Sequence, residues 1–445
     1  MSAALLPDEP DPTTAELLAA RSHLRMNAVD GLLMEDVPLR AVAAASGTPC
    51  WVLSAGFLRA RFRTLRRALD GAGLPDAAIH YAVKANDHLA VLSLLGREGA
   101  GADVVSGGEL RRALRAGIAP GRIVFSGVGK TDAELFLAAA EGVGQVNVES
   151  AEELERLSAV AGVRPAPGSV PVALRVNPDV DAGTHAKITT GRAGNKFGVA
   201  WDEAAALYAR AAALPGVRPV GLAVHIGSQV MSPAPFRAAW ERLADLVRAL
   251  RAAGHAVETV DCGGGLGVGY RNEPGMTPAA FAGAMKVSLG GLGVRLAIEP
   301  GRWLVAQAGV LLASVVTEKH TGARRFVVLD AAMNDLLRPA MYEAWHGLVP
   351  LSPADAAAAV TQADIVGPVC ETGDTFARNR PVPPFRPGAA VALLDAGAYG
   401  AVMSSTYNAR PLAPVVLVDG ADWTVVRARQ KVEALWAGEV IPTWK

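Results

Sequence analysis

Short apolar runs alternate with amphipathic helical stretches along most of the chain. Eight runs rich in β-branched and aromatic residues indicate buried strands, each followed or preceded by a helix rich in Ala, Leu and Arg. The predicted strands are residues 79–84, 102–105, 122–125, 145–148, 172–176, 221–226, 257–261 and 294–298. Eight alternating units in about 250 residues predict a (β/α)8 TIM-like barrel, an α/β fold with its active site at the carboxyl ends of the strands. The alternative, a doubly wound open sheet, needs fewer strands and usually carries a Rossmann fingerprint, which is absent here.

The pattern changes after about residue 309. Short β-rich runs separated by Pro and Gly turns follow at residues 310–316, 325–329, 389–394 and 415–418. These runs predict a compact C-terminal β-domain. A further strand is predicted within residues 47–53, followed by an Arg-rich amphipathic helix. We therefore expect residues 1–52 to form an N-terminal segment, residues 53–308 the barrel and residues 309–445 the β-domain.

Composition excludes several classes of partner. The 445 residues include 43 basic and 43 acidic side chains, and this balance predicts no nucleic-acid partner. No apolar run reaches membrane-spanning length, and the first residues lack the pattern of a signal peptide, so no membrane contact is expected. The three cysteines are far apart and have no metal-ligand spacing, which favours a cytoplasmic protein without a metal site.

The segment IHYAVKAN, residues 79–86, carries the most informative side chain. Alternation along a strand places His80, Ala82 and Lys84 on one face. A lysine at the end of a buried strand needs a chemical reason, and burial would favour a neutral amine able to form a Schiff base with an aldehyde. The alternative is a lysine that reaches from the strand end into solvent, and this segment alone leaves both interpretations open.

Polar residues recur at the other predicted strand ends. His225 and Ser228 follow the sixth strand, and Glu299 follows the eighth. The glycine-rich run 263–269 offers backbone N–H groups that can bind a phosphate. Taken singly, His225 fits a core histidine and Glu299 a surface ion pair. Together with Lys84 they supply the imine partner, ring support, phosphate site and ring-nitrogen partner that pyridoxal phosphate needs.

Several motifs then resemble the barrel of fold-type III pyridoxal-phosphate decarboxylases, relatives of alanine racemase. They are YAVKAN, DVVSGGEL, NVES, RVNP, THAKITTG, NKFGV, HIGSQ, CGGGLGVGY and EPGR. Three long motifs beyond the predicted barrel, at residues 330–346, 367–374 and 395–400, are similar to those of diaminopimelate decarboxylases. The resemblance extends from about residue 47 to the end of the chain.

The resemblance implies a role for each matching residue. Lys84 would bind pyridoxal 5'-phosphate covalently, His225 would stack on its ring, and Glu299 would stay ionised and face the ring nitrogen. Cys370 would return a proton after CO2 leaves, and Cys370 with Glu371 would reach the partner's site in a homodimer with shared active sites. The phosphate would be held by Ser228, Gly264, Gly265 and Tyr399 and by the backbone of Glu299, Pro300, Gly301 and Arg302. The substrate would be bound by Arg302, Arg338, Tyr342, Glu371 and Tyr399.

The implied reaction is decarboxylation of meso-2,6-diaminopimelate to L-lysine and CO2, the last step of lysine biosynthesis. The family also includes the N-terminal segment in its β-domain, so residues near 41–52 are expected to pair there. Two alternatives stay open: a related decarboxylase of ornithine, lysine, carboxynorspermidine or a specialised-pathway intermediate, and a non-catalytic pyridoxal-phosphate-binding protein. Thr372, Pro414 and Trp345 depart from the family pattern and leave room for a shifted substrate preference.

Overall fold

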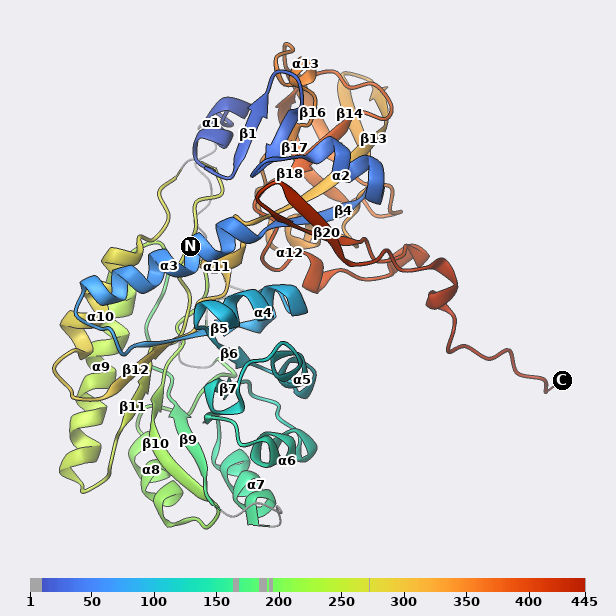
Figure 1. Ribbon diagram of the computed structural model, residues 1–445. Helices are drawn as coiled ribbons and strands as arrows, with labels where there is room; N and C mark the ends of the chain where they lie inside the picture. Colours follow the sequence, from blue (N-terminus) through green and yellow to red (C-terminus); the bar gives the residue numbers. More distant parts are fainter. Residues whose placement is uncertain (1–9, 163–167, 184–189, 192–194, 272, 445) are drawn as a thin grey trace. The chain divides into compact units, whose positions relative to one another are not determined.

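The chain folds into two compact units. The computed structural model describes residues 10–162, 168–183, 190–191, 195–271 and 273–444 (Figure 1). The barrel unit contains Arg59–Val268 and Pro274–Leu304, and the β-unit contains Asp8–Leu58, Gly269–Glu273 and Val305–Lys445. No described helix combines the length and the apolar character that crossing a membrane requires.

Eight parallel strands of the barrel unit close on themselves, which confirms the predicted (β/α)8 fold. In barrel order they are β10 (Val217–Ala223), β11 (Thr259–Asp261), β12 (Arg295–Ile298), β5 (Ala78–Ala82), β6 (Gly101–Val104), β7 (Ile123–Phe125), β8 (Gln145–Val148) and β9 (Val170–Arg175). The closing pair sets Ile298 of β12 opposite Ile79 of β5. The first predicted strand is two residues too long, because Val83–Ala85 form the 3-10 turn η1.

Helices surround this barrel (Figure 1). They are α4 (Leu89–Glu98), α5 (Gly107–Arg115), α6 (Asp132–Glu141), α7 (Ala151–Gly162), α8 (Ala204–Ala213), α9 (Pro233–Ala252) and α10 (Pro278–Leu289). Helix α6 begins with a capping box, in which Thr131 and Glu134 each accept a hydrogen bond from the other's backbone N–H. Side chains alternate between the two faces of β5, so Ile79 and Tyr81 are buried on the face opposite to His80.

The β-unit is built around a nine-stranded sheet. Its main path runs β17 (Thr375–Val382), β16 (Thr361–Val366), β14 (Arg324–Leu329), β13 (Gly309–Thr321), β4 (Cys50–Ser54), β19 (Val415–Asp419) and β20 (Asp422–Arg427). Two further strands, β18 (Ala390–Leu393) and β15 (Leu348–Pro350), extend from β13. A separate three-stranded sheet contains β1 (Leu24–Asn27), β2 (Gly31–Met34) and β3 (Val37–Pro38). The helices of the β-unit are α1 (Thr14–Ala19), α2 (Leu39–Ser46), α12 (Arg338–Tyr342) and α13 (Pro353–Ala356). Two further helices, α3 (Ala55–Gly71) and α11 (Arg302–Val305), have residues in both units.

The N-terminal segment contributes a central strand to this sheet. On β4, Val52 lies opposite Val310 of β13 on one side and Val416 of β19 on the other. All three side chains are fully buried in one apolar cluster. The expected pairing of the N-terminal segment with the β-rich part of the chain is therefore confirmed.

Candidate active site

Lys84 lies just beyond the carboxyl end of β5, in the turn η1. Its Nζ is 2.8 Å from Oδ2 of Asp103, which closes the neighbouring strand β6. The Lys84 side chain is 36% exposed, whereas Asp103 is fully buried. The amine therefore sits at the rim of the barrel, partly exposed and held by an ion pair. The other Asp103 oxygen, Oδ1, is buried and has no hydrogen-bond partner among the residues that the structure describes.

His225 follows β10 and is fixed by the glycine loop. The Gly264 backbone N–H donates to His225 Nδ1 at 3.2 Å, so the neutral ring carries its proton on Nε2. Burial, followed by the positive charges of Arg175 and Lys84, lowers the pKa of His225 well below its usual value. The imidazole is thus a neutral, planar ring, and it lies close enough to Lys84 for the lysine's charge to affect its pKa.

The glycine loop packs against backbone on every side. A Cβ at Gly264 would lie 2.0 Å from the carbonyl oxygen of Glu299, and one at Gly265 would lie 2.5 Å from that of Gly227. Only glycine fits at these two positions. Within the described residues, the N–H groups of Gly265 and Gly301 have no acceptor. The Gly264 amide is already engaged by His225, so Gly265 and Gly301 are the better phosphate donors.

Ser228 and Arg302, both predicted site residues, are in direct contact. The Nε and Nη2 atoms of Arg302 lie 3.3 and 3.0 Å from Ser228 Oγ. Arg302 is the first residue of α11 and is buried. A buried guanidinium next to a hydroxyl and to the Gly301 amide provides donors for an anion such as a phosphate or carboxylate.

Glu299 is buried near two other carboxyl groups, and these surroundings favour its protonated form. Burial, followed by the negative charges of Asp103 and Asp261, raises the pKa of Glu299 well above its usual value, while Lys84 opposes the shift. Because a nearby cation favours the carboxylate form, a protonated ring nitrogen placed against Glu299 would restore the anion. The site therefore fits a cationic partner at this position.

The β-unit holds the other predicted residues. Arg338 opens α12 and Tyr342 closes it. Nη1 of Arg338 is 2.9 Å from Nε2 of His346, and its guanidinium lies 4.7 Å from the centre of the Tyr270 ring. Tyr399 has a left-handed backbone, with φ of 55°. That conformation is uncommon for a residue other than glycine and is often found at binding sites.

Cys370 and Glu371 form a second group within the β-unit. Cys370 is exposed, and Glu371 accepts a hydrogen bond of 2.6 Å from the hydroxyl of Tyr407. An exposed thiol next to a carboxylate is available to a molecule outside the unit.

The sequence reasoning missed several residues of the site. Asp261 and Ser126 line the barrel interior beside Glu299, and Tyr270 and His346 contact Arg338. A signal for Asp261 was present, because it lies two residues before the glycine run and alternates with Thr259. Tyr270 closes the motif CGGGLGVGY and carried a similar signal.

The comparisons with known proteins agree with this chemistry. Residues 56–306 match the family of the pyridoxal-dependent decarboxylase, pyridoxal binding domain. The diaminopimelate decarboxylase of Zymomonas mobilis is 49% identical, over 93% of this chain and 97% of the relative. That of Pseudomonas aeruginosa is 48% identical, over 92% and 96%. The crystal structure of diaminopimelate decarboxylase from Helicobacter pylori complexed with L-lysine superposes with a TM-score of 0.85 at 37% identity, covering 90% of this chain and 98% of that chain.

Proposed function

Because this chain belongs to the diaminopimelate decarboxylases, a family of pyridoxal-dependent enzymes, we infer that it converts meso-2,6-diaminopimelate to L-lysine and CO2. This is the last step of lysine biosynthesis. The similarity extends over 93% of the chain and includes solved relatives complexed with L-lysine. The cofactor, pyridoxal 5'-phosphate, accepts the electrons that are released when the Cα–carboxylate bond breaks.

We propose that Lys84, His225 and Glu299 hold the reactive part of the cofactor. The observation that carries this proposal is their arrangement at the strand ends: Lys84 follows β5 and His225 follows β10, while Gly264, whose amide donates to His225 Nδ1, packs against the carbonyl of Glu299. Lys84 provides the amine, the neutral His225 ring provides a flat surface, and Glu299 faces the ring nitrogen. The phosphate lies against Ser228, Gly264, Gly265, Pro300, Gly301, Arg302 and Tyr399.

The substrate residues are likewise a proposal. Arg302, Arg338, Tyr342, Glu371 and Tyr399 bind diaminopimelate. A planar guanidinium such as that of Arg338 recognises a carboxylate through two parallel hydrogen bonds, and diaminopimelate keeps one carboxylate that does not react. Diamine precursors such as ornithine lack this distal carboxylate. The presence of Arg338 therefore favours diaminopimelate over the substrates of related decarboxylases.

Two further proposals concern assembly and location. Cys370 donates a proton to the substrate carbon after CO2 leaves, acting from the partner subunit of a homodimer, with Glu371 beside it. The exposure of Cys370 supports this role, because the thiol is accessible to a second copy. The enzyme is cytoplasmic, as expected for a biosynthetic decarboxylase with three unpaired cysteines.

Incubation of the purified enzyme with matched substrates tests the function. We expect CO2 and lysine from meso-diaminopimelate, and neither from LL-diaminopimelate, which lacks the D-configured centre. L-Ornithine and L-lysine serve as controls for diamine-forming activity. Faster release of CO2 from ornithine would indicate a related decarboxylase instead. Cofactor binding without CO2 from any substrate would indicate a binding protein.

A further inference from the structure

Polar side chains fill much of the barrel interior, where TIM barrels usually pack branched apolar residues. Gln145 and Asn147 of β8 reach Thr259 and Asp261 of β11, at 3.4 and 3.3 Å. Since β9 and β10 separate these two strands in the barrel, the hydrogen bonds cross its interior. Burying polar groups costs free energy even when they are paired, so this arrangement calls for a functional explanation.

Asp261 and Glu299 are at the centre of this network. Their side chains lie close together, because a single side-chain amide reaches both. Asn147 Nδ2 lies 3.3 Å from Asp261 Oδ2 and 3.5 Å from Glu299 Oε1, and the two carboxyl groups are only 1% and 7% exposed. Two adjacent buried carboxyl groups do not both stay ionised, so one proton is expected between them.

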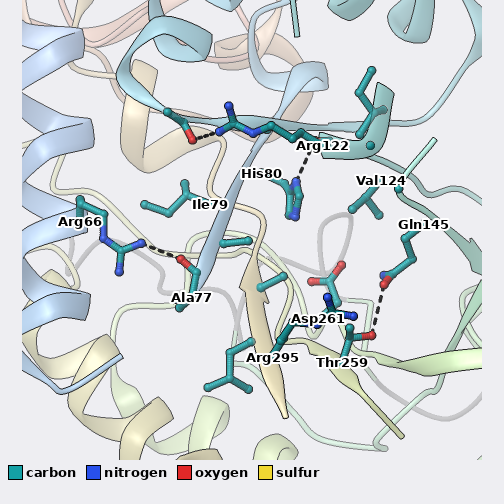
Figure 2. A pocket seen from close by; sticks show the side chains of 18 of the residues that line it. Arg66, Ala77, Ile79, His80, Arg122, Val124, Gln145, Thr259, Asp261 and Arg295 are labelled. Carbon is teal, nitrogen blue, oxygen red and sulfur yellow. Dashed lines mark hydrogen bonds between the residues drawn. The ribbon is translucent and has the colours of Figure 1, made fainter. Parts of the chain in front are cut away.

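A cavity of about 410 Å³ opens at the end of the barrel where the strands begin. Figure 2 shows its lining, with His80, Gln145, Thr259 and Asp261 on the inner side. The arginines at its edge are engaged with backbone: Arg66 donates to the carbonyl of Ala77 at 2.6 Å, and Arg122 donates to that of Gly99. This strand-start cavity is polar and large enough for several water molecules.

We propose that Asp261 and Glu299 share one proton inside the barrel, and that this proton exchanges with solvent through the strand-start cavity. The proposal rests on the proposed function in one respect, the assignment of Glu299 to the ring nitrogen of the cofactor. Asp261 is then a positioning residue, which controls the charge of Glu299 from the side opposite to the substrate. The cavity contacts Asp261 directly and so connects the pair to the outside.

The charged groups around the pair agree with a single shared proton. Burial raises the pKa of Asp261 and, more strongly, that of Glu299, and the negative charge of Asp103 on β6 raises both further. His80 on β5 opposes the shift of Asp261, and Lys84 opposes that of Glu299. The pKa of the adjacent Cys262 thiol is raised well above its usual value, first by burial, so it stays neutral. These charges therefore favour one proton on the pair in the cofactor-free chain.

Infrared spectroscopy of the full chain without cofactor tests the shared proton, because a protonated carboxyl group has a carbonyl band distinct from that of a carboxylate. At neutral pH we expect the wild type to show such a band that is absent from Glu299→Gln, and Glu109→Gln identifies the band of Glu109, whose pKa burial raises to about 7. In Asp261→Asn the Glu299 group loses its anionic neighbour, so the band should titrate at least about one pH unit lower. Asp245→Asn, an exposed carboxylate on α9, is the matched control.

An unchanged titration midpoint of the band in Asp261→Asn would refute the shared proton. The absence of such a band from the wild type would also refute it. If Asp261→Asn fails to fold, Glu299→Gln decides alone, since a band that persists in this variant belongs to another group. These spectra need neither substrate nor turnover. A failure of the proposed function would therefore show in the CO2 assay and leave the infrared result intact.

Deuterium exchange of the same band in the full chain without cofactor tests the route. Val124 lines the cavity, and Val124→Phe fills part of it (Figure 2). We expect exchange of the band to slow at least about tenfold in Val124→Phe. Val287→Phe, an equal change on an exposed face of α10, should exchange as the wild type does. Wild-type exchange rates in both Val124→Phe and a second cavity-filling variant, Ala297→Phe, would exclude the cavity as the route.

Discussion

Replacing Lys130 by methionine is expected to lower the free energy of unfolding by about 3–5 kcal/mol at neutral pH, the range for breaking a buried ion pair from one side. Lys130 is 1% exposed, and its Nζ donates to Glu153 at 2.7 Å and to the carbonyls of Gly127 and Asn147 at 2.7 and 2.8 Å. Methionine fills a similar volume but donates nothing. The change therefore leaves one buried carboxylate and two buried carbonyls without this donor.

The loss should depend on pH. Burial raises the pKa of Glu153, and Lys130 is the largest influence that lowers it. Without Lys130 this pKa rises further above that of the unfolded chain, so the folded state favours the protonated acid. A raised folded-state pKa gives stability that is present at low pH and lost as pH rises through it. The difference between wild type and variant should therefore be smaller at about pH 5 than at about pH 8.

Urea denaturation followed by circular dichroism measures both effects. Lys286→Met, an exposed lysine on α10, is the matched control and should change stability by less than about 0.5 kcal/mol. The double variant Lys130→Met/Glu153→Gln should recover more than about 1 kcal/mol, because it removes the unpaired charge. A loss below about 1 kcal/mol at neutral pH, or one that does not change with pH, would refute the reasoning.

Three further outcomes are expected. Lys84→Ala should abolish the visible absorbance of the purified enzyme, whereas a variant that stays coloured and is reduced by borohydride at another lysine would relocate the site. Arg338→Lys should raise KM for diaminopimelate about 10- to 100-fold, at roughly 1.4 kcal/mol per tenfold, because the bidentate contact is lost; unchanged kinetics would remove Arg338 from the pocket. Burial raises the pKa of Glu109 to about 7, so wild-type stability should fall as pH rises from about 4.5 to about 7. Glu109→Gln should make the urea midpoint less dependent on pH in this range. If the midpoint varies with pH as it does in the wild type, Glu109 is not the cause of the fall in stability.

The barrel was predictable because its signal is local. Eight apolar runs of strand length, separated by helical periodicity, specify eight strands without knowledge of their partners. The end of the first strand was not predictable in the same way. Val83, Lys84 and Ala85 continue the apolar run of β5, yet they turn into η1, and alternation does not distinguish a strand residue from a short turn after it.

The state of the site depends on contacts that are distant in sequence. Burial and the negative charges of Asp103 and Asp261, which belong to two other strands, raise the pKa of Glu299, and the sequence did not indicate these neighbours. Similarly, Tyr270 follows the glycine loop in sequence but belongs to the β-unit, where its carbonyl accepts a hydrogen bond from Arg21 and its ring lies against Arg338. Such effects arise from tertiary packing, which residue type and spacing do not specify.

The position of β4 has a consequence for synthesis on the ribosome. This strand leaves the ribosome early, yet one of its two neighbours in the sheet, β19, emerges about 365 residues later. At about 5–20 residues per second, Val52 must wait roughly 20–70 s before its side of the sheet can be completed. All eight barrel strands are available by residue 298, well before that time. We therefore expect the nascent barrel to assemble while an apolar N-terminal strand is still uncovered, which makes this stage the one at which a chaperone is most needed.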